Sequence, residues 1–145
     1  MSVNEFMLEF CKGHLKYDNE DDIKMFMENK SNELIISRVP AIINKKIIIE
    51  ITEAHGCASQ YKKGDRFLFD MSGNLIGKES PEKLCIFALT PMGALVKSLQ
   101  ELMIAGVSPA KLAFSKTSCS DVGVKCGGWG RVVMDARIDE NESEE

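Results

Sequence analysis

Four cysteines carry the most specific chemistry in this sequence. Each stands at the end of an expected secondary-structure element, at Cys57, Cys85, Cys119 and Cys126. Thiolates are soft sulfur donors, and four of them can complete a tetrahedral zinc site or hold an iron–sulfur cluster. We therefore predict that these four cysteines converge on one zinc or iron–sulfur centre.

The spacing of these cysteines leaves other roles open. The C-x-x-C pair that is typical of zinc knuckles does not occur in the chain. Cys119 or Cys126 could instead be a nucleophile activated by neighbouring N–H groups or by Lys125. His55 could replace one cysteine as a ligand, although a surface or hydrogen-bonded histidine is the commoner role. Only some of the four thiols could form a partial site or a redox pair, or all four could be structural, since free cysteine is often buried.

The fifth cysteine, Cys11, belongs to the first of three expected N-terminal helices. Apolar residues from Val3 to Leu15 recur at helical spacing and place Cys11 on their face, so we predict a core thiol. Asn19 can cap a second helix. A third is expected to begin near Ser31 and to end near Pro40, because proline disfavours helix in the residue that precedes it.

Strand patterns begin after these helices. The β-branched run from Ile47 to Ile51 predicts a buried strand, and a second strand is expected around Phe67, between two glycine turns. Further strands are predicted at 111–116 and at 131–138, where apolar residues alternate. Two turns so close together favour antiparallel pairing.

One long helix is expected between these strands. Ser80 is a suitable N-cap with Pro81 at the first helical position, and the apolar segment that follows should be kinked near Pro91 and end at Gly106. The predicted fold class is α+β, with a small antiparallel sheet packed on this long central helix. We expect an N-terminal helical extension (residues 1–42), a cysteine-containing domain (residues 43–138) and a disordered acidic tail (residues 139–145).

The glycine-rich segment 127–130 surrounds the only tryptophan, Trp129. Its N–H groups and Arg131 could bind a phosphate, but the segment lacks the endings of the known phosphate-binding loops. The preferred interpretation is a tight turn into the last strand, with Trp129 as a packing lid.

Charge and hydropathy favour neither a nucleic acid nor a membrane as partner. The formal net charge is -4, and five acidic residues lie in the last seven positions, DENESEE. The remainder is close to neutral, which favours neither nucleic acid nor an anionic membrane. No stretch approaches the ~20 apolar residues of a membrane span, and no signal sequence is evident. We therefore expect a cytoplasmic protein.

Residues 47–138 resemble a family of small, uncharacterised prokaryotic proteins. The shared pattern reads Glu53-Ala54-His55-Gly56-Cys57, then Lys63-Gly64-Asp65-Arg66-Phe67-Leu68-Phe69-Asp70, then Leu84-Cys85 and the segment from Cys119 to Gly130. The resemblance implies a compact single domain and no established activity. Family members often carry a proline soon after the later cysteines. In this chain Cys85 is followed by Ile86, and Cys119 is followed by Ser120.

The functional expectation is an accessory protein or small subunit of an anaerobic redox or metabolic complex that holds a metal or iron–sulfur centre. The helical extension would supply a surface for homo-oligomerisation or for a larger enzyme. Two alternatives remain: a small-molecule enzyme with a reactive cysteine in the Cys119–Arg131 loop, and a structural homo-oligomer with buried thiols.

Overall fold

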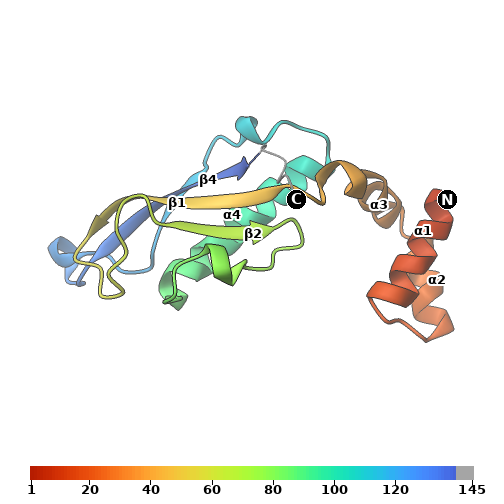
Figure 1. Ribbon diagram of the computed structural model, residues 1–145, viewed down its shortest axis with the longest axis horizontal. Helices are drawn as coiled ribbons and strands as arrows, with labels where there is room; N and C mark the ends of the chain where they lie inside the picture. The colour runs from red at the N-terminus through yellow and green to blue at the C-terminus, as the bar shows by residue number, and fades with distance from the viewer. Residues whose placement is uncertain (140–145) are drawn as a thin grey trace. The chain divides into compact units, whose positions relative to one another are not determined.

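The computed structural model describes residues 1–139 and shows an α+β fold. The described chain contains four α-helices and one small, open, antiparallel sheet of four strands (Figure 1). Contacts divide it into two compact units, Met1–Ile42 and a second that begins at Ile43. Asp139 ends the last strand, and the rest of the expected acidic tail, residues 140–145, lies outside the described residues.

The first unit is helical. Its elements are α1 (Val3–Glu9), which continues as a π-helical turn (Phe10–His14), α2 (Glu20–Glu28) and α3 (Lys30–Ile42). Asn19 caps α2 as predicted, because its side-chain oxygen accepts the N–H groups of Asp21 and Asp22 at 2.9 and 3.2 Å. The side chain of Cys11 is buried. Its predicted place in an apolar core is therefore confirmed.

The third helix ends near Pro40, as predicted, but it runs through the proline and does not stop at the residue before it. Pro40 lies inside α3, which ends at Ile42. Because Pro40 stands near the C-terminal end of the helix, its missing N–H removes one hydrogen bond from the final turn and leaves the earlier turns intact.

The second unit is built around the sheet, in which the strand order is β2-β1-β4-β3. The strands are β1 (Lys46–His55), β2 (Arg66–Asp70), β3 (Lys116–Ser118) and β4 (Arg131–Asp139). Alternation in β4 buries its four even-numbered apolar residues, as predicted. The two central strands pair Ile49 with Ala136 and Ile51 with Met134, which places these side chains in one buried layer.

The long helix α4 (Ile86–Ile104) begins later than predicted. Ser80 does not cap it, because the Ser80 hydroxyl accepts the N–H of Leu68 in β2 at 3.0 Å and donates to the carbonyl oxygen of Ile76. Cys85 is the N-cap residue instead. The helix is continuous through Pro91 and contacts β1, β3 and β4.

The strand predicted at 111–116 is also displaced. A short 3-10 turn covers Pro109–Lys111, and β3 starts only at Lys116. The register explains the shift, since Lys116 is the first residue of β3 to pair with β4, opposite Asp135. Within residues 1–139, no helix has the length and apolarity that a membrane crossing requires.

Candidate functional site

Three of the four predicted ligands border one small cavity in the second unit. Cys57 follows β1, Cys85 precedes α4 and Cys119 follows β3, and each thiol-bearing residue is partly exposed. The cavity has a volume of about 80 Å³. This is well below the ~300 Å³ of a typical small-molecule pocket, so the space suits an ion or a few atoms.

The surroundings of Cys85 lower the pKa of its thiol. Burial raises the pKa of the Cys85 thiol, but the nearby Ala88 N–H, Ser59 hydroxyl and Phe87 N–H lower that pKa, and the lowering prevails. Two of these donors are N–H groups in the first turn of α4, where helix N-termini favour negative charge. The thiolate, which is the metal-binding and nucleophilic form, is therefore favoured at Cys85.

Tyr61 fixes the position of Cys85. Its hydroxyl oxygen accepts the Cys85 N–H at 2.8 Å and donates to the carbonyl oxygen of Lys83 at 2.6 Å. Burial raises the pKa of this hydroxyl; the Cys85 N–H lowers it by less, and the thiols of Cys85 and Cys57 raise it further. Tyr61 therefore stays protonated and acts as a neutral support beneath the start of α4.

A proline in α4 ties the Cys119 loop to the same helix turn. Pro91 has no N–H to donate to the carbonyl oxygen of Phe87, which would be its helical partner. The N–H of Ser120 donates to this oxygen instead, at 3.1 Å. The Phe87 carbonyl oxygen, which Pro91 leaves without a helical donor, thus holds Ser120, the residue next to Cys119.

Cys119 is also fixed against the start of β4. Its N–H donates to the carbonyl oxygen of Val132 at 3.1 Å, and its sulfur accepts the Val132 N–H at 3.4 Å. The first bond extends the pairing of β3 with β4 by one residue, and the second holds the sulfur at the edge of the cavity.

Asp121 organises the glycine-rich loop that follows. Its two carboxylate oxygens accept the N–H groups of Gly123, Trp129 and Gly130 at 2.9, 3.0 and 3.1 Å. The bonds from Gly123 and Gly130 chiefly hold the pKa of Asp121 below its usual value. A side chain at Gly128 would collide with this carboxylate. The loop therefore folds around Asp121.

The start of β4 crosses close to the end of β1. A Cβ atom at Gly130 would collide with the backbone of Gly56 and lie 2.6 Å from the Cys57 nitrogen. Only glycine permits this approach, because real Cβ atoms do not come so near to backbone. The crossing brings Cys57 beside the loop that carries Cys119.

The structure does not bring Cys126 or His55 to the cavity. Cys126 is exposed, on the 3-10 turn Val124–Cys126, and the exposed ring of His55 lies 2.8 Å from a carboxylate oxygen of Glu53. The Trp129 side chain is 79% exposed, so its predicted role as a packing lid is wrong. The loop's N–H groups, including that of Trp129, point toward the Asp121 carboxylate, and the indole ring lies on the solvent side of the loop.

The three thiols border the cavity without forming a finished metal site. Within residues 1–139, no three histidine, cysteine or acidic side chains are disposed to hold a metal ion as they stand. Binding would therefore require rotation of cysteine side chains toward a shared centre. The main-chain bonds of Cys85 and Cys119 would survive such a rotation, but the bond from the Val132 N–H to the Cys119 sulfur would have to break.

Comparisons with known proteins add no relative. No protein family, curated protein or solved structure matches this chain.

Sequence reasoning missed Ser59, Tyr61 and Asp121, which support the site. Asp121 stands two residues before Gly123, a pattern typical of an aspartate that accepts nearby N–H groups in a turn, and this signal could have been used. Tyr61 and Ser59 carry no such signal, because their partners lie more than twenty positions away in the chain.

Proposed function

We propose that this protein binds a soft metal centre through Cys57, Cys85 and Cys119, as an accessory protein or small subunit. The observation that carries the proposal is the meeting of three thiols from separate segments on one ion-sized cavity. Three thiolates can hold zinc with a fourth position open, or three irons of a cluster. Cys126 would be a fourth ligand only if its turn moved toward the cavity.

The thiols fit this donor set chemically. Metals bind the thiolate form, and the lowered pKa of Cys85 makes that form available nearer to neutral pH. All five cysteines are free, which agrees with a reducing, cytoplasmic habitat and with an anaerobic redox or metabolic complex.

The proposal takes α4 as the central helix on which the sheet packs. Its buried side chains support that arrangement, and its first turn presents Cys85 to the cavity. Exposed apolar side chains lie at the start of α4 and on the glycine-rich loop: Leu84, Ile86, Phe87, Val122, Val124 and Trp129. Such exposure is typical of an association surface, and it supports a role within a larger assembly or a homo-oligomer.

The test is metal analysis of protein purified without oxygen, with an ultraviolet–visible spectrum. We expect one zinc ion or one iron–sulfur cluster per chain, and its loss in Cys57→Ser, Cys85→Ser and Cys119→Ser. Cys126→Ser is the matched control, since Cys126 is outside the cavity, and it should retain the metal. Loss of metal in Cys126→Ser as well would favour the four-cysteine site. No binding after reconstitution with zinc, or with iron and sulfide, would overturn the proposal.

A reactive thiol is the second candidate. The lowered pKa of the Cys85 thiol makes this residue the candidate nucleophile. In metal-free protein, iodoacetamide should then modify Cys85 first, as identified by peptide mass spectrometry. Equal labelling of all partly exposed cysteines would exclude this candidate.

A further inference from the structure

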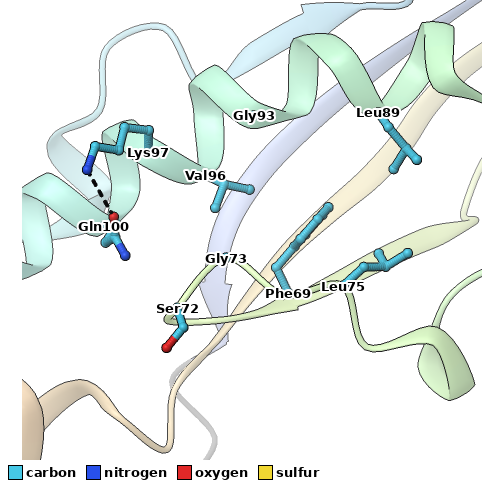
Figure 2. A pocket seen from close by; sticks show the side chains of 9 residues that line it. All are labelled: Phe69, Ser72, Gly73, Leu75, Leu89, Gly93, Val96, Lys97 and Gln100. Carbon is cyan, nitrogen blue, oxygen red and sulfur yellow. Dashed lines mark hydrogen bonds between the residues drawn. The ribbon is translucent and has the colours of Figure 1, made fainter. Parts of the chain in front are cut away.

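A second and much larger cleft lies on α4, away from the thiols. It has a volume of about 400 Å³ and is bordered by α4 on one side and by β2 with the turn that follows it on the other. Figure 2 shows Phe69 and Leu75 facing Leu89 and Val96 across this space. The volume falls within the range of small-molecule sites.

Every α4 residue of the cleft lies on one helix face. They are Leu89, Gly93, Val96, Lys97 and Gln100, and each lies three or four residues from another of them, which places their side chains on the same side of the helix. The cleft therefore follows the helix axis, and its two ends can differ in chemistry.

Gly93 lies in the middle of this face and has no structural reason to be glycine. An interior glycine destabilises a helix relative to alanine. A Cβ atom at Gly93 would meet nothing within 4 Å, and its φ is not positive. Neither close packing nor backbone conformation thus requires glycine here. What the missing side chain does provide is free space in the cleft.

The two ends of the cleft differ in polarity. Figure 2 shows Lys97, Gln100 and Ser72 at one end and the side chains of Leu75 and Leu89 at the other. The Lys97 ammonium lies 3.4 Å from the Gln100 side-chain oxygen and 3.2 Å from a carboxylate oxygen of Glu101. The Gln100 amide also donates to the carbonyl oxygen of Met71 at 2.8 Å, which fixes the polar end in place.

We propose that this cleft binds a small amphipathic carboxylate, with its apolar body over Gly93 and its carboxylate at Lys97. The apolar walls match an aliphatic or aromatic body. Lys97 is the one cation that borders the cleft, and its present partner Glu101 is on an exposed helix surface, where a ligand carboxylate can replace it. This site is independent of the thiol cavity.

The test is calorimetric titration of the full chain with hexanoate, octanoate and decanoate, each below its micelle concentration. Affinity should rise about tenfold for each two methylene groups added, because each enters the apolar cleft. Octanol and octylamine should bind more weakly than octanoate. An affinity that does not depend on chain length, or no saturable binding of any of the three acids, would overturn the proposal.

Variants locate the site. Gly93→Leu should fill the cleft and lower octanoate affinity at least tenfold, while Gly93→Ala raises the thermal midpoint and shows that the helix tolerates a side chain there. Retained affinity in Gly93→Leu would overturn the proposal.

The head group is tested by Lys97→Met, which should weaken octanoate about fivefold and leave octanol unchanged. Lys24→Met is the matched control, because Lys24 forms the same type of exposed ion pair one helical turn from its partner, Glu28. Equal losses in both variants would overturn the assignment of the carboxylate to Lys97.

Discussion

The cysteine of the helical unit and the cysteines of the sheet unit have opposite surroundings. Cys11 is 0% exposed and lies on an apolar helix face with Met7. Cys57, Cys85 and Cys119 are partly exposed around a cavity. Burial among apolar groups makes a thiol inert, whereas access and hydrogen-bond donors favour the reactive thiolate. Cys11 is therefore suited to packing, whereas the three cysteines at the cavity are accessible enough to react or to bind a ligand.

The two regions also differ in how they are built. The helical unit relies on short-range signals, such as the cap at Asn19. The cavity depends on contacts between distant segments: Ser120 with Phe87, Tyr61 with Cys85, and Gly130 against Gly56. Changes at such contacts should therefore have larger effects than equivalent changes in the helices.

The largest effect is expected for alanine in place of a glycine at the crossing. Gly130→Ala should lower the free energy of unfolding by roughly 2–4 kcal/mol, because the new Cβ would collide with the Gly56 backbone. In the helical unit, the Cβ atom that Gly13→Ala adds would have no other atom within 4 Å. This substitution should raise the free energy of unfolding by up to about 1 kcal/mol. Urea unfolding of both variants measures the difference. Equal effects would remove the distinction between the regions.

The next effect concerns the buried thiol. Cys11→Ala should lower the free energy of unfolding by roughly 1–2 kcal/mol, because it leaves a small cavity in a packed core. It should leave the metal content unchanged. Reduced metal in a variant that remains folded would show that Cys11 is not purely structural.

How far the sequence predicts this molecule depends on the range of the interactions. The apolar alternation of β4, the run in β1 and the cap of α2 are local, and each was predicted. Ser80 resembles an N-cap in sequence, but its hydroxyl bonds across to Leu68, so the helix starts at Ile86. No local pattern reveals that bond.

The candidate site follows the same rule. Its cysteines were identified by type, and three of them border one cavity. Cys126 lies elsewhere because the loop that contains it wraps around Asp121, an arrangement set by three backbone N–H groups. Metal binding itself stays a prediction.

A smaller effect is expected in the dependence of stability on pH. The pKa of Cys85 is lower in the folded chain than its usual value, after hydrogen bonds outweigh the opposing effect of burial. Its ionisation therefore adds stability that is fully present above the unfolded pKa and is lost as the pH falls through the folded pKa. Unfolding of metal-free protein across this range should show the trend, and Cys85→Ala should flatten it. An identical profile in the variant would contradict the assignment.

The smallest effect is expected from the hydroxyl that supports Cys85. Ser59→Ala removes one donor to the sulfur, so the pKa of Cys85 should rise and the pH midpoint of its alkylation should move upward. Stability should change by no more than about 0.5 kcal/mol, since Ser59 is outside the core. A pH titration of iodoacetamide labelling measures the midpoint, and an unchanged midpoint would remove Ser59 from the site.

X-ray absorption at the metal edge tests the central claim most directly, because it counts the sulfur atoms bound to the metal. For zinc-loaded protein we predict three sulfur ligands at about 2.3 Å and one lighter ligand, with the same count in Cys126→Ser. Two or fewer sulfur ligands in the wild-type protein would contradict a site formed by Cys57, Cys85 and Cys119.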